Sequence, residues 1–259
     1  LVYLSHHYPD RLVRFGKKRN LCVSNLGRLF AKTTLLMFTK AFEHYDSFRE
    51  NRLTKRRFST AVWQELIAEW SIHFAVRELG KTEEGRPIHE VKWGEGPIQV
   101  IAWSQMHGDE ATATLAMTDI FRLLSSSEEF AQEFKQKLHQ KITLRVIPRL
   151  NADGAERWQR ETALGIDMNR DATKQNSVEA QILSAWADEI KPEFAFNLHD
   201  QNRLYSVGNS PEQTHIAFLA TTGDDEGTWT PSRLRAGQIC NRMLSQIQPI
   251  IPGKIAKWT

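Results

Sequence analysis

The segment Ile98-Gln-Val-Ile-Ala-Trp-Ser-Gln-Met-His-Gly-Asp-Glu110 joins an almost wholly apolar run to a short polar motif. The run from Ile98 to Trp103 suits a β-strand that is buried on both faces of a sheet. His107 and Glu110 follow it, three residues apart, where the strand is expected to pass into a helix. At this spacing one imidazole and one carboxylate can bind the same metal ion.

A second histidine, His199, follows another apolar run, Glu193 to Leu198, which also reads as a strand. Two histidines and one glutamate form the open three-ligand set of catalytic zinc, with water in the fourth position. Taken singly, Glu110 is compatible with a solvated helix start and His199 with a hydrogen-bonded loop histidine. The three residues together predict a zinc centre, provided that they converge in space.

Apolar periodicity divides most of the chain after Phe58 into alternating strands and helices. Helices are expected over residues 59–70, 110–124, 177–190 and 231–246, capped at Ser59 or Thr60, at Asn176 and at Thr230. Strands are expected over residues 73–79, 88–93, 98–103, 142–147, 193–198 and 215–220, the first two forming a hairpin. Residues 148–176 read as one long polar loop. This alternation predicts an α/β domain with a largely parallel or mixed sheet, whose ligands bind beyond the carboxyl ends of strands.

The long loop collects cationic and amide side chains between the two metal-ligand motifs. It contains Asn151-Ala-Asp-Gly154, Arg157, Arg160 and Gly165-Ile-Asp-Met-Asn-Arg-Asp171. Arg170 could supply the planar bidentate donor that a substrate carboxylate requires, with Asn169 sharing that task. Arg160 could face a carbonyl oxygen that becomes an oxyanion. The alternative is that these arginines are solvated loop charges.

These motifs occur in the order of the zinc carboxypeptidase family (M14), which the chain resembles over about residues 60–259. The resemblance implies an α/β fold with a mixed, mainly parallel, twisted eight-stranded sheet and helices on both faces. It assigns His107, Glu110 and His199 to one Zn²⁺, and Asn169 and Arg170 to the substrate carboxylate. It assigns Arg160 to polarising the scissile carbonyl, and Asp167 to orienting His107. The family's usual Asn-Pro-Asp-Gly motif has Ala152 in place of proline.

One residue that the resemblance requires has no counterpart in the sequence. The family uses a glutamate on a late apolar strand as the general base. The acids after His199 are Asp200, Glu212, Asp224, Asp225 and Glu226, and none lies in an apolar run. We therefore expect that the general-base Glu is not present in this chain, and that the fold is incomplete at its C-terminus by at least the last strand.

Charge separates the N-terminal part from the rest of the chain. Residues 1–57 carry 13 Lys/Arg and four Asp/Glu, a net +9, whereas the remainder carries 21 and 27, a net −6. We expect residues 1–57 to be a basic extension outside the core and residues 58–259 to be the catalytic domain. Such an arm is compatible with binding to nucleic acid or an anionic membrane, or with a transit peptide. A further alternative is that residues 1–36, which precede the first methionine, Met37, are upstream sequence read in frame. The arm has no clear period, no Gly-rich loop and no RNA-binding signature, so neither nucleic acid nor membrane is expected as a partner.

The remaining features fit an enzyme of a reducing compartment. The chain contains no secretory signal, no run of about 18 apolar residues and only two isolated cysteines, so we expect it to be cytoplasmic. The predicted function is a zinc metallocarboxypeptidase that acts on peptides with a free C-terminal carboxylate. The alternatives are a zinc amidase or deacylase on a small acyl-amino acid or cell-wall peptide, and a non-catalytic module that binds peptide carboxylates. The sequence determines neither the preferred C-terminal residue nor the oligomeric state.

Overall fold

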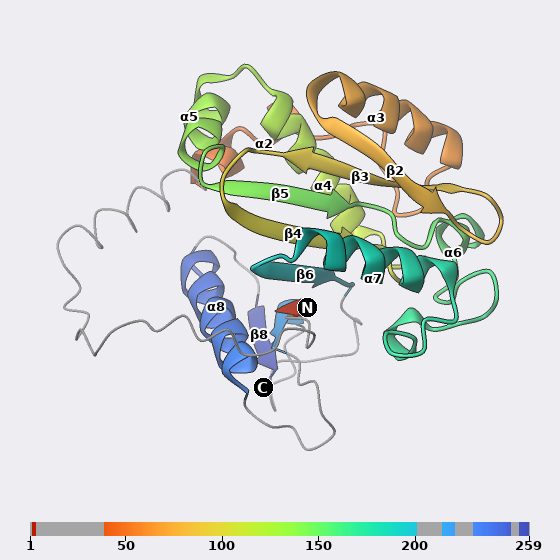
Figure 1. Ribbon diagram of the computed structural model, residues 1–259. Coiled ribbons are helices and arrows are strands. Elements are labelled where there is room, and N and C mark those ends of the chain that lie inside the picture. Colours follow the sequence, from red (N-terminus) through yellow and green to blue (C-terminus); the bar gives the residue numbers. More distant parts are fainter. Residues whose placement is uncertain (1, 4–38, 201–213, 221–229, 250–253, 259) are drawn as a thin grey trace.

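The computed structural model describes residues 2–3, 39–200, 214–220, 230–249 and 254–258. Within them, the described strands form a six-stranded sheet of order β1-β6-β4-β5-β3-β2 and a two-stranded sheet of β7 and β8 (Figure 1). The strands are β1 (Val2–Tyr3), β2 (Ala75–Lys81), β3 (Pro87–Trp93), β4 (Ile98–Ser104), β5 (Ile142–Ile147), β6 (Phe194–Leu198), β7 (Thr214–Leu219) and β8 (Lys254–Trp258).

The six-stranded sheet is mixed, as predicted. Strand β4 runs parallel to both of its neighbours, β5 and β6, and these three form the centre of the sheet. The outer pairings β1 with β6, β3 with β5 and β2 with β3 are antiparallel. With the parallel pair β7 and β8, parallel and antiparallel pairings are equally numerous among the described strands, and the centre of the six-stranded sheet is parallel.

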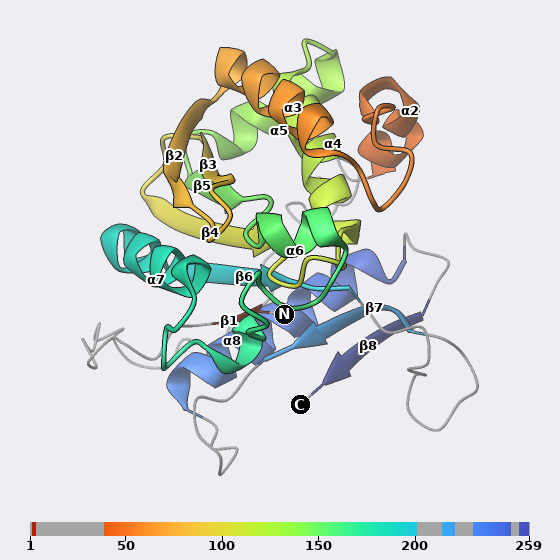
Figure 2. The ribbon, with the colours of Figure 1, turned by 90° about the vertical axis from the view of Figure 1, so that its right-hand side faces the viewer.

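Helices cover both faces of this sheet, which confirms the predicted α/β architecture (Figures 1 and 2). The first face packs against α3 (Thr60–His73), α4 (Thr112–Ser125) and α5 (Glu129–Leu138), through a cluster that includes Leu66 and Phe121. The other face packs against α7 (Val178–Ile190), where Trp186 meets side chains of β4 and β5. Each fully buried large apolar side chain contributes about 1.5–3 kcal/mol. Helix α8 (Pro231–Ile247) packs against β7, β8 and Phe196.

Side chains that cap the backbone fix where three of these helices begin. The Ser59 and Thr230 hydroxyls accept hydrogen bonds from the backbone N–H groups of Val62 and Arg233, as predicted. Helix α7 differs from the prediction, because Ser177 is its cap and Asn176 is not. The predicted loop 148–176 also contains helix α6 (Ala152–Arg157) and the short 3-10 helix η1 (Met168–Arg170).

Packing extends further toward the N-terminus than the predicted boundary at Phe58. Leu53 belongs to the main apolar cluster, and Phe48, in the short helix α2 (Tyr45–Phe48), is buried beside Leu123 of α4. Glu50 is also buried and pairs with Arg52. The last part of the predicted extension is therefore packed against the domain. Among the helices of the described residues, none is both long and apolar enough to span a bilayer.

Candidate metal centre

The predicted ligands lie where two adjacent parallel strands end. Ser104, the last residue of β4, pairs with Leu198, the last residue of β6. His199 follows β6 directly, and His107 and Glu110 lie in the turn between β4 and α4. The carboxyl ends of parallel strands meet at one edge of a sheet, so this topology brings the two motifs together.

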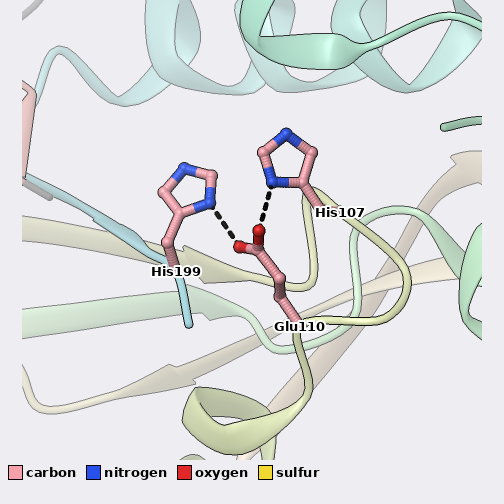
Figure 3. A group of neighbouring side chains, drawn as sticks. All are labelled: His107, Glu110 and His199. Carbon is pink, nitrogen blue, oxygen red and sulfur yellow. Dashed lines mark hydrogen bonds and ion pairs between the residues drawn. The ribbon is translucent and has the colours of Figure 1, made fainter. Parts of the chain in front are cut away.

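The side chains of His107, Glu110 and His199 converge (Figure 3). The Glu110 carboxylate lies between the two rings, with Oε1 2.8 Å from Nδ1 of His107 and Oε2 2.6 Å from Nδ1 of His199. One ligand atom from each residue lies within 4.8 Å of the others. Three atoms bound to one tetrahedral ion at about 2 Å lie about 3.3 Å apart, so the arrangement is close to a ligand set.

The electrostatics of this cluster favour a cation. Burial by itself would raise the pKa of the Glu110 carboxyl. The hydrogen bonds and charges of His107 and His199 outweigh burial and hold that pKa well below its usual range. Glu110 is thus ionised at neutral pH, and one carboxylate with two imidazoles is the nitrogen-oxygen donor set that zinc accepts. The three residues fit a zinc ion by their donor chemistry.

Asp167 and Arg160 both contact this cluster. Asp167 Oδ1 lies 3.1 Å from Nε2 of His107, on the opposite side of the ring from Glu110. A carboxylate there fixes the ring orientation and its tautomer. Arg160 donates from Nη1 to Glu110 at 3.2 Å and from Nε to Asp167 at 3.2 Å. This arginine therefore pairs with two carboxylates of the cluster, while its side chain stays 40% exposed.

Asn169 and Arg170 lie next to Asp167 in η1. Asp167 caps this short helix, since its carboxylate accepts the Asn169 backbone N–H at 2.9 Å. Asn169 is half-buried, whereas Arg170 is exposed and makes a weak contact with the Asn169 carbonyl at 3.4 Å. Arg157, which the sequence left as a loop charge, forms an ion pair with Glu84.

A buried polar network supports the turn that carries His107, and the sequence did not assign its members this role. Asn151 is fully buried; its side-chain amide donates to the backbone carbonyls of Met106, Arg160 and Glu161. Gln105 donates to the Gly108 carbonyl at 2.8 Å. The motif Asn151 to Gly154 thus positions two segments of the site. The sequence did contain a signal for this role, because Asn151 is a good N-cap by type. Its side-chain oxygen accepts a hydrogen bond from the backbone N–H of Gly154, three residues later, and so caps α6.

Glycine is required where this turn meets α6. A Cβ on Gly108 would lie 2.0 Å from the carbonyl carbon of Gly154 and 2.2 Å from the backbone nitrogen of Ala155. The two backbones therefore touch at His107-Gly108, and any larger residue would push the ligand turn away. The glycines of the two sequence motifs meet in space.

Among the described residues after His199, Asp200 is the one acid. Its carboxylate accepts from the backbone N–H and the hydroxyl of Thr112, both at 3.0 Å, and pairs with Arg56. Asp200 therefore caps helix α4, which begins at Thr112 rather than at the predicted Glu110. Glu212 and the acids at 224–226 lie outside the described residues.

Comparison with known proteins gives one family match. The model of a family described as zinc carboxypeptidase matches residues 60–212. That span contains both ligand motifs and the loop between them. No curated protein sequence matches the chain.

Solved structures show the same fold at low sequence identity. A metallo-carboxypeptidase from Burkholderia cenocepacia is 17% identical, with a TM-score of 0.65, over 78% of this chain and 54% of that one. Carboxypeptidase A from Helicoverpa armigera is 18% identical, with a TM-score of 0.56, over 85% of this chain and 64% of that one. The chain thus spans about half to two thirds of the length of these two proteins.

Proposed function

The chain belongs to the zinc carboxypeptidase family. From that premise we propose that its site uses a bound zinc ion to remove the C-terminal residue of peptides. The observation that carries the proposal is the convergence of His107, Glu110 and His199 within 4.8 Å, with Asp167 behind His107. A zinc ion in this site would supply a Lewis acid and a coordinated water of lowered pKa. His107, Glu110 and His199 would hold it.

The chain's other residues would bind and orient the substrate. Glu110 and Asp167 engage Nη1 and Nε of Arg160, and we propose that the remaining Nη2 donates to the scissile carbonyl oxygen. Arg170 is exposed, and its guanidinium fork matches the geometry of a terminal carboxylate. Asn169, held in place by Asp167, would share that carboxylate. A free C-terminal carboxylate is therefore the substrate feature that we propose the site recognises.

A peptide assay with a blocked control tests this function. The protein at its natural length, loaded with one equivalent of zinc, is incubated with peptides that differ in their C-terminal residue and analysed by mass spectrometry. We expect stepwise loss of single C-terminal residues, no reaction with the C-terminal amides, and loss of activity after zinc removal with recovery on readdition. Arg170→Ala should raise KM more than it lowers kcat, because a carboxylate contact contributes mainly to binding.

Other outcomes would point to the alternative functions. Cleavage of N-acyl-amino acids without cleavage of peptides would favour an amidase or deacylase. Peptide binding that requires a free carboxylate, with no cleavage of any peptide in the presence of bound zinc, would favour a non-catalytic module. Failure to bind zinc at a one-to-one ratio would contradict the assignment of the metal ligands.

A further inference from the structure

Arg56 connects the two segments that carry the proposed metal ligands. Its Nη2 donates to the backbone carbonyl of Asp109 at 2.9 Å and also pairs with the carboxylate of Asp200. Asp109 directly precedes Glu110, and Asp200 directly follows His199. One guanidinium group thus joins the turn after β4 to the end of β6, within one residue of a ligand on each side.

Asp200 extends this connection to Glu110 itself. Besides capping α4 through Thr112, it donates its backbone N–H to Oε2 of Glu110 at 3.2 Å. The Asp200 side chain is 10% exposed, whereas that of Arg56 is 45% exposed. An ion pair this exposed contributes little to overall stability. The ion pair matters more for the geometry of the site than for stability. Arg56 binds the carboxylate of Asp200, and Asp200 contacts the segment that carries Glu110 and directly follows His199.

Arg56 is in turn held in place by its neighbours. Its guanidinium carbon lies 5.6 Å from the ring centre of Trp158, within the range of a cation–π contact. The next residue, Arg57, donates to the Glu156 carbonyl at 3.1 Å, and Ser59 caps helix α3. The backbone around Arg56 is therefore anchored to α6 and α3, and its side chain bridges from a fixed base.

We propose that Arg56 is a positioning residue for the metal centre. It sets the separation between the Asp109–Glu110 and His199–Asp200 segments, and so holds Glu110 and His199 in register for a common ion. Its contacts are with Asp109, Asp200 and Trp158, which are not among the proposed metal ligands. The inference rests on the proposed metal site. Removal of an outer partner of metal ligands commonly lowers metal affinity by about 10–100-fold, and we expect the same here.

Zinc affinity measured by chelator competition tests this role, with zinc ions alone as the probe. Arg56→Ala should raise the Kd for zinc by about 10-fold or more. Arg49→Ala is the matched control, since it removes the same charge from an exposed arginine of the same part of the chain. It should bind zinc as tightly as the parent. The absorption spectrum of the Co²⁺-loaded Arg56→Ala protein should change, while the melting temperatures of the metal-free variants should remain alike.

Arg56→Lys keeps the positive charge but lacks the planar guanidinium fork, so its zinc affinity should lie between those of the parent and Arg56→Ala. This variant tests the role if Arg56→Ala does not fold. The double variant Arg56→Ala with Asp200→Asn should bind zinc only slightly more weakly than Asp200→Asn alone, because both substitutions remove the same ion pair. Unchanged zinc affinity in both Arg56 variants would overturn the inference alone. A parent protein that binds no zinc would overturn the proposed function as well.

Discussion

At the scale of single residues, the half-buried Glu110 and the buried Glu179 have opposite environments. Glu110 meets two imidazoles and Arg160, so its charge is compensated. Glu179, in the first turn of α7, is 1% exposed, and its Oε1 has no hydrogen-bond partner among the described residues. Burial, together with the negative charges of Asp153, Glu83 and Asp171, raises the pKa of Glu179 to about 7.

This raised pKa predicts that Glu179 destabilises the fold as pH rises. Between about pH 4.5 and 7 the folded protein keeps a proton that the unfolded chain releases, so the free energy of unfolding falls across that window. Above about pH 7 the loss reaches roughly 3 kcal/mol at most. Glu179→Gln cannot ionise, so it should be more stable than the parent at pH 8, with the gain shrinking toward pH 5. Urea unfolding of the metal-free protein across this range measures the difference.

Glu65→Gln provides the control, because Glu65 is exposed on α3 and should show little change at any pH. A Glu179→Gln advantage that is the same at pH 5 and pH 8 would contradict the titration of Glu179 and would point to packing instead.

At the scale of elements, the start of helix α7 shows how a tertiary contact selects between two capping residues. Asn176 and Ser177 are both good N-caps by type. The Asn176 backbone N–H is bound to Asp171, which also accepts from the backbone and the hydroxyl of Ser177. This arrangement directs the Ser177 oxygen toward the N–H of Ala180 and leaves Asn176 exposed. Asp171, which directly follows Arg170 at the end of η1, thus connects η1 to the beginning of α7.

The two residues should therefore respond differently to the same substitution. Ser177→Ala removes a cap and a buried hydrogen bond to Asp171, and should lower the free energy of unfolding by about 1–2 kcal/mol. Asn176→Ala should change it by less than about 0.5 kcal/mol. Chemical denaturation of both variants measures this, and equal effects would contradict the assigned cap.

At the scale of the whole molecule, the core draws on residues well before the first long helix. Leu53 packs in the same cluster as α3, α4 and the sheet, and the Arg56 side chain contacts both segments that carry the proposed metal ligands. The basic charge of residues 1–57 concealed this, because charge pattern reports solvent exposure and not the contacts of single apolar residues. The division at residue 58 stays a prediction for domain organisation, but packing crosses it.

Leu53→Ala should accordingly destabilise the domain like a core substitution. Leu53 is 7% exposed, so truncation should cost about 2–4 kcal/mol of unfolding free energy. Leu164→Ala is the control, because Leu164 is 57% exposed and should change stability by about 0.5 kcal/mol or less. Equal stabilities of the two variants would show that residues before Phe58 do not belong to the cooperative core.

The sequence by itself determined most of the long elements and indicated the candidate metal ligands. Apolar period located strand β5 with the bounds observed and placed α3, α7 and α8 to within a residue or a few, because side-chain burial repeats locally along a strand or helix. Helix α6, with six residues, is too short to show a period. Helix α5 could have been found from Phe130, Phe134 and Leu138, which share one face.

Only the tertiary structure decided which backbones touch and which distant charges meet. The contact of Gly108 with Gly154 and the bond between Arg56 and Asp200, 144 positions apart, depend on how the layers stack and on which strand ends adjoin. Local periodicity carries no information about such separations. It identifies a buried face but not the partner that covers it, and the partner is what holds His107, Glu110 and His199 together.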